Sequence, residues 1–411
     1  MRVTACRVCA AAPLADVLDF GTVALANSYL PDAAAAAMEP RYPMALCLCQ
    51  ACGHLQINEE VPPADLFRNY LYVTGTSDAV HQHGRLLNAS LSAVLPSGRQ
   101  AAPFIVEAAS NDGTILALFK KAGWRVLGVD PAENIADMAN ARGVETWPTF
   151  FSRQTAGEIV ARHGRADVFL GRHVLAHVAG LHDFLDGVRA VLRDDGAAVV
   201  ECPHVLPMFT ELQYDQVYHE HLGFFSVTVL RRLFAMHGLE LFAVREVGMH
   251  GGSLLAFAQP AGAGRPEEAS VSRIMQREAE VGVGTLEAWR GFADRVIRQR
   301  EALVAELTTL RRQGKRVAAY GAAAKGQVML QWCGIGPDLV EFIVDKSELK
   351  QGRLTPGTHI PILAPQALLD RQPDVVLLCA WNFADEILRQ QKAYLDRGGR
   401  FLHPIPLPHY L

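Results

Sequence analysis

Residues 104–113, with the sequence FIVEAASNDG, decide the fold of this chain. Their first half is an apolar run of the length of a buried strand, and the Ser-Asn-Asp-Gly that follows is a turn signal. The sequence predicts a helix over residues 114–122 and a second strand over residues 124–129, which ends at Asp130. Strands that alternate with helices in this way are typical of a parallel, doubly wound α/β sheet.

The same alternation continues on both sides of a charged helical connector at residues 266–315. It predicts two Rossmann-like, doubly wound domains, preceded by a small cysteine-rich module. We therefore expect an α/β protein in three parts, which cover residues 1–68, 69–265 and 266–411. The further strands expected are residues 166–170 and 197–201 in the first domain, and 316–320, 340–345 and 374–379 in the second.

Cysteines gather at the start of the chain in two CxxC pairs. Such pairs offer four thiolates to one tetrahedral ion, so Cys6, Cys9, Cys49 and Cys52 predict a structural Zn²⁺ site. Four reduced thiols without a metal are the alternative. Cys47 is interpreted as a packing residue. The remaining cysteines are expected to be free and buried: Cys202, Cys333 and Cys379.

The overall composition limits the partners of the protein. Its net charge of −4 gives no reason to expect nucleic acid or an anionic membrane. No apolar stretch is long enough to span a bilayer, and the N-terminus lacks the apolar core of a secretion signal. We therefore expect a cytoplasmic protein.

The end of the first predicted strand is the candidate site for an adenosine-bearing ligand, since open α/β sheets bind ligands there. A carboxylate at the end of the next strand, Asp130, is placed to accept both ribose hydroxyls. The phosphate-binding pattern G-x-G-x-x-G is absent, and an acidic loop with Glu107 and Asp112 would repel a pyrophosphate. These features favour S-adenosylmethionine over NAD. A strand and turn that bind nothing are the alternative.

Several motifs along the chain resemble one family in the same order. Beside the CxxC pairs and residues 107–113, they are Tyr-His-Glu-His at residues 218–221 and Gly-Gly-Ser at residues 251–253. The sequence is similar to the deoxysugar C-methyltransferases of antibiotic biosynthesis, which methylate C-3 of nucleotide-linked 4-keto-sugars. Two positions depart from the family pattern, because Ala109 stands where a glycine is common and Leu255 where an arginine is frequent.

The resemblance implies how the parts divide the work. Residues 69–265 would bind S-adenosylmethionine, residues 266–411 would bind a nucleotide sugar with thymidine as the expected nucleoside, and the protein would be a monomer or weak dimer. The residues carried over to the cofactor pocket are Glu107, Ser110, Asn111, Asp112, Gly113, Asp130, Pro131, Tyr72 and Ser77.

Methylation of carbon requires an enolate, and therefore a base and a group that stabilises the enolate oxygen. We expect His221 to be the base, Glu220 to orient an imidazole or balance its charge, and Tyr218 to share the proton or donate to the enolate. The resemblance also places His177 near the sugar ketone. A buried histidine that is merely part of the core is the alternative for His221. A metal pair of His221 with His219 is not expected, and His81 and His83 are interpreted as surface or hinge residues.

The second domain repeats the strand-turn-helix arrangement. A helix N-terminus attracts phosphate, so Gly321, Ala322 and Lys325 are candidates for the diphosphate. Asp345 is a candidate for the base or ribose, and Trp381 and Asn382 for stacking and hydrogen bonding. The alternative is a degenerate Rossmann-like domain that packs against the rest of the chain and binds no nucleotide.

Three other functions remain open at this point. A sugar O-methyltransferase would need a base but no enolate stabiliser. A zinc-module binding protein would lack catalysis altogether. An NAD-dependent sugar enzyme is disfavoured by the missing glycine pattern.

Overall fold

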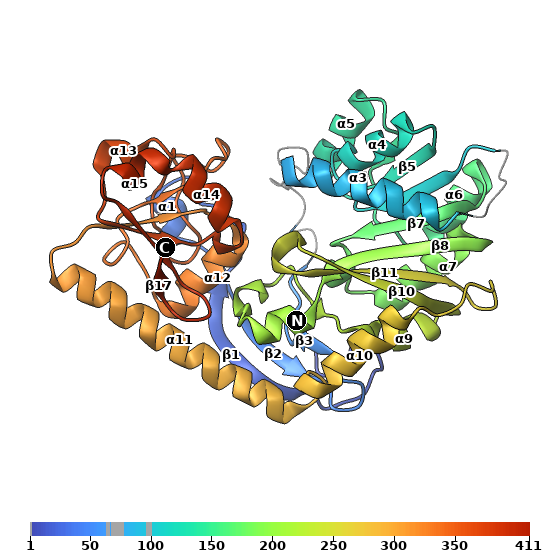
Figure 1. The fold of residues 1–411 in the computed structure, drawn as a ribbon, viewed down its shortest axis with the longest axis horizontal. Helices are drawn as coiled ribbons and strands as arrows, with labels where there is room; N and C mark the ends of the chain where they lie inside the picture. Colours follow the sequence, from blue (N-terminus) through green and yellow to red (C-terminus); the bar gives the residue numbers. More distant parts are fainter. Residues whose placement is uncertain (1, 63–65, 67–77, 96–100) are drawn as a thin grey trace.

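The computed structural model describes residues 2–62, 66, 78–95 and 101–411, so the candidates Tyr72 and Ser77 lie outside the described residues. Two α/β domains stand side by side, and the N-terminal strands with helices α10 (Ala269–Val281) and α11 (Leu286–Arg312) line one side of the pair (Figure 1). The predicted class is confirmed: two doubly wound sheets and a small N-terminal module.

The first domain is built on a seven-stranded sheet of order β10-β11-β8-β7-β4-β5-β6. Its strands β4 to β8 are parallel, while β11 and β10 extend it in antiparallel fashion. The strand order reverses between β4 and β7, and such a switch point opens a crevice at the carboxyl ends of the two strands. The strands are β4 (Phe104–Ala108), β5 (Arg125–Val129), β6 (Thr146–Trp147), β7 (Ala166–Arg172), β8 (Leu192–Pro203), β10 (Leu239–Val247) and β11 (Ser253–Pro260).

Both faces of this sheet are buried, which explains why its strands read as continuous apolar runs. Along β4, Ile105 packs toward one set of helices, whereas Phe104 and Val106 pack toward the other. The first set is α3 (Asp78–Ala93), α4 (Thr114–Lys121) and α5 (Glu133–Ala141), and the second is α6 (Arg153–His163), α7 (Leu181–Val191), α9 (Val227–Ala235) and α10.

The C-terminal domain has a six-stranded sheet of order β14-β13-β12-β15-β16-β17, parallel except for β17. Its switch point lies at β12, where Gly321 has a φ of +94° and a Cβ at that position would lie 2.4 Å from the Cβ of Ala380. Only glycine fits there. The elements are β12 (Val317–Tyr320), α12 (Ala324–Cys333), β13 (Ile343–Val344), β14 (Ile362–Leu363), α13 (Ala367–Arg371), β15 (Val375–Leu378), α14 (Ala384–Gln390), α15 (Lys392–Asp396), β16 (Arg400–His403) and β17 (His409–Tyr410).

The N-terminal module is an antiparallel sheet of β1 (Ala15–Ala24), β2 (Arg41–Leu48) and β3 (Leu55–Ile57), with the short α1 (Ala33–Ala37) before β2. Its fourth strand, β9 (Gly223–Phe224), comes from far along the chain and pairs with β3. Because β9 begins two residues after His221, this pairing ties the Tyr-His-Glu-His motif to the N-terminal module.

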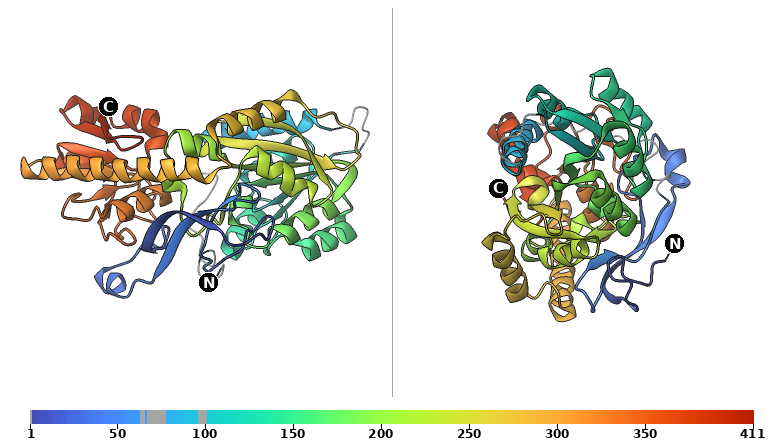
Figure 2. Two further views of the ribbon diagram at one scale, coloured as in Figure 1. Left: turned by 90° about the horizontal axis from the view of Figure 1, so that it is seen from below. Right: turned by 90° about the vertical axis from the view of Figure 1, so that its right-hand side faces the viewer.

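Helix α11 joins the three parts into one core. Its buried residues Trp289, Phe292 and Leu303 belong to a cluster that also contains residues of β1 to β3, of the segment 205–222 and of the C-terminal sheet. Seen from below, α11 runs along the C-terminal domain toward the first domain, with the N-terminal strands on the same side (Figure 2).

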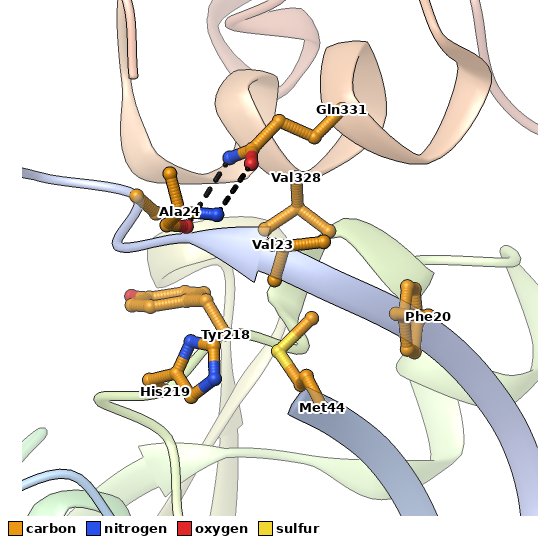
Figure 3. Close-up of a pocket in the computed structure, with 9 residues that line it drawn as sticks. Phe20, Val23, Ala24, Met44, Tyr218, His219, Val328 and Gln331 are labelled. Atoms are coloured by element: carbon orange, nitrogen blue, oxygen red, sulfur yellow. Dashed lines mark hydrogen bonds between the residues drawn. The ribbon is translucent and has the colours of Figure 1, made fainter. Parts of the chain in front are cut away.

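A direct clamp connects the module to the C-terminal domain (Figure 3). The side chain of Gln331 on α12 accepts a hydrogen bond from the backbone nitrogen of Ala24 at 2.8 Å and donates to its carbonyl oxygen at 3.3 Å. Beside it lies a small cavity where all three parts meet, lined by Phe20, Val23, Ala24, Ala26, Met44, Tyr218, His219, Val328 and Gln331.

One expectation from the sequence was wrong. His83 is not a surface or hinge residue, since it is 5% exposed and its Nε2 lies 2.9 Å from Oε2 of Glu201. The physical reason is helical spacing, because His83, Leu87 and Leu91 recur every four residues on the buried face of α3. The side chain of His81 lies outside the described residues.

Replacing Gln331 with alanine should loosen the clamp between the module and the C-terminal domain. Two hydrogen bonds to the buried Ala24 are lost, at roughly 0.5–1.5 kcal/mol each. We expect a lower urea midpoint of unfolding, while the exposed Gln390→Ala should leave the midpoint unchanged. Equal midpoints for wild type and Gln331→Ala would show that the clamp does not contribute to stability.

Candidate active site and zinc site

Four cysteine thiols converge in the N-terminal module. The Sγ atoms of Cys6, Cys9, Cys49 and Cys52 lie within 4.8 Å of one another, with two pairs at 3.5 Å. Zn–S bonds of about 2.3 Å in a tetrahedron place neighbouring sulfurs roughly 3.8 Å apart, so this donor set fits one Zn²⁺ with no open position. A closed site of this kind is typical of a structural ion, since four protein sulfurs leave no coordination position for a substrate.

Cys47 is a packing residue, as the sequence predicted. It is buried and its thiol donates to Oδ1 of Asp16 at 3.3 Å. Burial raises the pKa of Cys47 to about 12, so the thiol keeps its proton. The three other cysteines are also free and buried: Cys202, Cys333 and Cys379.

The candidate cofactor site lies at the carboxyl ends of β4 and β5. The carboxylate of Asp130 accepts from the backbone nitrogens of Asn111 at 2.9 Å and Ala132 at 3.0 Å, which fixes its orientation. The buried Ser110 Oγ and Glu107 Oε2 have no hydrogen-bond partner among the residues described, so polar atoms at this strand end are left for a ligand. These atoms fit a polar adenosyl donor.

The turn after β4 has an unusual backbone. Ala109, Asn111 and Gly113 have φ values of +54°, +51° and +72°, in the left-handed region that favours glycine. Glycine would adopt the conformation of Ala109 at a lower cost than alanine does. The turn closes with a hydrogen bond from the nitrogen of Gly113 to the carbonyl oxygen of Ser110 at 3.2 Å.

The acidic loop is more neutral than the sequence suggested. Glu107 accepts from Nε of Arg172 at 2.7 Å, and Asp112 forms an ion pair with Arg142 at 2.6 Å. Burial raises the pKa of Glu107 to about 7, although Arg172 acts in the opposite direction. Because each carboxylate has an arginine partner, the loop repels a pyrophosphate less than two bare carboxylates would.

The Tyr-His-Glu-His motif forms a buried hydrogen-bonded pair. Nδ1 of His221 lies 2.8 Å from the carbonyl oxygen of Gln216, and Nε2 lies 2.8 Å from the hydroxyl of Tyr218. A carbonyl oxygen can only accept, so Nδ1 carries the proton and Nε2 accepts from the phenol. Burial, and then the charge of His177, hold the pKa of His221 well below its usual value, so the ring is neutral.

His177 lies beside this pair. It ends the 3₁₀ turn Leu175–His177 after β7, and its ring centroid is 4.9 Å from that of His221. Burial lowers the pKa of His177 to about 4. The nitrogen of Leu222 also donates to the carbonyl oxygen of Ala176 at 2.7 Å, which holds the motif against the carboxyl edge of the first sheet.

The side chain of Glu220 bonds to the N-terminal module rather than to His221. The group that orients His221 is the Gln216 carbonyl, whereas Oε1 of Glu220 accepts from Asn27 of the N-terminal module at 2.6 Å. Burial raises the pKa of Glu220 to about 7. Asn27 carried no signal in the sequence, because only tertiary packing brings it to the motif.

His219 faces away from His221. Its Nε2 lies 3.0 Å from the carbonyl oxygen of Pro43 in β2. Within the ranges that the structure describes, the four cysteines are the one group of three or more ligand side chains close enough to hold a metal ion.

In the C-terminal domain, Gly321, Ala322 and Asp345 come together at the carboxyl edge of the sheet. Asp345 accepts from the nitrogens of Ala322 and Ser347, both at 2.8 Å. Lys350, which the sequence reasoning missed, donates to the carbonyl oxygen of Ala322 at 2.7 Å. Tyr29 of the N-terminal module donates to the same oxygen.

Lys325 and Trp381 face the first domain from the carboxyl edge of the C-terminal sheet. Nζ of Lys325 donates to the carbonyl oxygen of His250 at 2.6 Å and lies 5.3 Å from the centre of the Trp381 ring. The indole nitrogen of Trp381 donates to Asp215 at 2.6 Å. Asn382 follows in the turn Trp381–Phe383.

A second group that sequence reasoning missed surrounds Glu201 at the end of β8. Its carboxylate is buried between His83 at 2.9 Å and His173 at 3.3 Å. Burial acts to raise the pKa of Glu201, but the two histidines outweigh it and hold the pKa below its ordinary value. The ring of His173 in turn contacts that of His250, with centroids 4.4 Å apart.

Comparison with known proteins identifies the family. Three family models match in succession: a zinc binding domain over residues 6–67, a methyltransferase domain over 80–244 and a C-methyltransferase C-terminal domain over 248–406. The C-methyltransferase NovU of Streptomyces niveus is 38% identical over 99% of this chain and 96% of its own. The chain belongs to this C-methyltransferase family. It is therefore an S-adenosylmethionine-dependent methyltransferase with a structural zinc site.

Solved structures are similar to part of this C-methyltransferase. Geranyl diphosphate C-methyltransferase from Streptomyces coelicolor A3(2) is 15% identical and covers 44% of this chain and 81% of its own, with a TM-score of 0.36. Magnesium protoporphyrin IX methyltransferase from Synechocystis PCC 6803 is 11% identical and covers 45% of this chain and 82% of its own, with a TM-score of 0.34.

Membership of the family decides between the open functions. It sets aside the NAD-dependent sugar enzyme and the non-catalytic binding protein, and it favours methylation on carbon over methylation on oxygen. Among the helices described, none is both long and apolar enough to cross a membrane.

Replacing Cys52 with serine should remove the metal. A serine hydroxyl is a much poorer zinc ligand than a thiolate, so the four-sulfur site loses its closed coordination. We expect bound zinc to fall from about one ion per chain to nearly none, measured by atomic emission. The matched control is Cys47→Ser, a buried cysteine outside the cluster, and equal zinc loss in both variants would argue against the assigned site.

Replacing Asp130 with asparagine should weaken binding of the methyl donor. A hydrogen bond to a charged group contributes about 1.5–3 kcal/mol, so the Kd for S-adenosylmethionine should rise roughly 10- to 100-fold by calorimetry. Asp137→Asn, an exposed change on the neighbouring α5, should leave the Kd unaltered. An unchanged Kd in Asp130→Asn would place the ribose elsewhere.

Proposed function

We propose that this C-methyltransferase methylates C-3 of a thymidine diphosphate-linked 4-keto-deoxysugar through an enolate. The observation that supports this most directly is the buried pair in which Tyr218 donates to the neutral ring of His221. A ketone acidifies the carbon beside it, and a positioned base then removes the proton. The pair lies against the carboxyl edge of the first sheet and is held by the other two parts.

In the proposed first step, the oxygen of Tyr218 takes the proton from C-3 while its own proton passes to Nε2 of His221. The electrons of the broken C–H bond form the enolate with the C-4 ketone. Because Nδ1 is already bonded to the Gln216 carbonyl, Nε2 is the nitrogen that accepts, and no tautomer change is needed.

Two neighbouring groups support the charges that form. His177, 4.9 Å from His221 between ring centroids, is neutral and suits a donor to the enolate oxygen. Glu220 precedes His221 in the chain, and burial raises its pKa to about 7; its ionised form would balance the imidazolium.

S-adenosylmethionine supplies an electrophilic methyl group, which the enolate carbon attacks as the carbon–sulfur bond breaks. The chain's task is to hold the two reactants in line and to exclude water from the enolate. The residues proposed to hold the donor are Glu107, Ser110, Asn111, Asp112, Gly113, Asp130 and Pro131, with Tyr72 and Ser77 outside the described residues.

The nucleotide would lie at the carboxyl edge of the C-terminal sheet. There the N-terminus of α12 and two cations, Lys325 and Lys350, suit the diphosphate, while Asp345 and Asn382 suit the ribose or base. Thymidine as the nucleoside, a cytoplasmic location and a monomeric or weakly dimeric state stay predictions.

The substrate assignment is tested with a panel of nucleotide-linked 4-keto-sugars and ¹³C-methyl S-adenosylmethionine. The expected product has gained one methyl group, and its carbon shift is that of a methyl on carbon adjacent to the ketone. A methoxyl shift would establish O-methylation instead. A methyl at C-5, the other carbon beside the ketone, would keep the chemistry and correct the position.

Replacing His221 with alanine should remove the proton acceptor. General-base catalysis contributes about 10²- to 10⁴-fold, so kcat should fall by at least about 100-fold, while the Kd for S-adenosylmethionine stays within about twofold. The matched control is His219→Ala, two residues away and facing Pro43, which should keep most turnover. Wild-type kcat in His221→Ala would rule out this histidine as the acceptor.

A further inference from the structure

A buried chain of contacts runs from the C-terminal domain into the catalytic pair. Trp381 donates to Asp215, Asp215 adjoins Gln216, and the carbonyl of Gln216 accepts from His221. We propose that the Trp381–Asp215 hydrogen bond positions the Tyr218–His221 pair and so makes proton transfer depend on the docking of the C-terminal domain. This inference rests on the proposed function, and it makes Asp215 and Trp381 positioning residues.

The Trp381–Asp215 contact is short and buried. The indole nitrogen lies 2.6 Å from Oδ2 of a carboxylate that is 0% exposed, and the tryptophan is 9% exposed. The other oxygen, Oδ1, has no hydrogen-bond partner within the described part of the chain. Without the indole donor, this buried carboxylate would keep only the backbone N–H of its own residue and the nearby charge of Lys325, which favours a shift of the segment.

Asp215 is the middle residue of a buried turn that is anchored to the C-terminal half. Tyr214, Asp215 and Gln216 form a buried 3₁₀ turn. The hydroxyl of Tyr214 donates to Gln299 of α11 at 2.7 Å, and Gln299 donates to the carbonyl oxygen of Pro404 at 2.8 Å. The turn is thus bound at two points to elements of the C-terminal half.

This turn determines which nitrogen of His221 carries the proton and which one accepts. The carbonyl of Gln216 holds the proton on Nδ1, so Nε2 faces Tyr218. If the carbonyl rotated away, the ring could exchange tautomers or turn, and Tyr218 would lose its acceptor in part of the molecules. The position of Asp215 therefore affects the fraction of molecules in which Nε2 of His221 can accept the proton of Tyr218.

Trp381 is also well placed to respond to the sugar nucleotide. It lies three residues after the end of β15, at the sheet edge where open α/β sheets bind ligands. Lys325 lies over its ring and donates to His250 of the first domain. Trp381 and Lys325 together thus contact the first domain and the catalytic segment, and they lie at the edge proposed to bind the nucleotide.

The test replaces each partner of the bond and both together. Trp381→Phe keeps an aromatic ring but removes the donor, Asp215→Ala removes the acceptor, and Asp215→Asn keeps an acceptor oxygen. Turnover is measured with S-adenosylmethionine and thymidine diphosphate-linked 4-keto-6-deoxyglucose. The matched control is Trp289→Phe, whose buried indole donates to the carbonyl oxygen of Val283 at 2.7 Å instead of to the turn Tyr214–Gln216.

We expect kcat to fall about tenfold or more in Trp381→Phe and Asp215→Ala, with the KM for S-adenosylmethionine within about twofold. The double variant should be no slower than the slower single variant, and Asp215→Asn should recover part of the loss. Wild-type kcat in both single variants, losses that multiply in the double variant, or an equal fall in Trp289→Phe would each overturn the proposal.

A spectroscopic readout keeps the proposal separate from the substrate assignment. In ¹⁵N-histidine spectra, with His221 assigned by its loss in His221→Ala, the wild type should show a single tautomer protonated at Nδ1. Trp381→Phe and Asp215→Ala should shift its two nitrogens toward averaged values. If no keto-sugar is methylated, the proposed function fails, and unchanged His221 signals in both variants would still overturn the positioning role.

Discussion

The constraint on which the site depends is the bond between Nδ1 of His221 and the carbonyl of Gln216. It leaves Nε2 as an acceptor inside a buried environment, where an imidazole is neutral and a phenol at 2.8 Å points its proton at it. A surface histidine would titrate freely and rotate. Burial alone would give a neutral ring. The Gln216 carbonyl in addition keeps the proton on Nδ1, so Nε2 is always the nitrogen that can accept a proton.

The architecture serves to hold this short segment from three sides. The N-terminal sheet takes β9 as its fourth strand, α11 anchors Tyr214, and the first domain binds Leu222 to Ala176. The zinc-binding module also contacts both domains directly. Its Asn27 donates to Glu220, and its Tyr29 donates to the carbonyl oxygen of Ala322 at the switch point of the C-terminal sheet. The proposed chemistry lies where the three parts meet, and no single part contains the whole proposed site.

The sequence predicted the two sheets and the four zinc ligands well, because strand alternation and CxxC spacing are local signals. It also brought Tyr218 and His221 together, since both lie in one short motif. It missed what tertiary packing creates: the Gln216 carbonyl in place of Glu220, the burial of His83 beside Glu201, and the arginines that neutralise Glu107 and Asp112. The hydrogen bond from Trp381 to Asp215 could not be predicted either, because no local sequence pattern indicates a contact between domains.

The central claim is that this pair makes an enolate before any methyl group moves. It is tested most directly by hydrogen exchange in D₂O, with the 4-keto-sugar nucleotide and S-adenosylhomocysteine, which has no methyl group to give. We predict that the wild type replaces the hydrogen at C-3 with deuterium and that His221→Ala does not. Methyl transfer by an enzyme that leaves this hydrogen in place, or equal exchange by His221→Ala, would contradict the account.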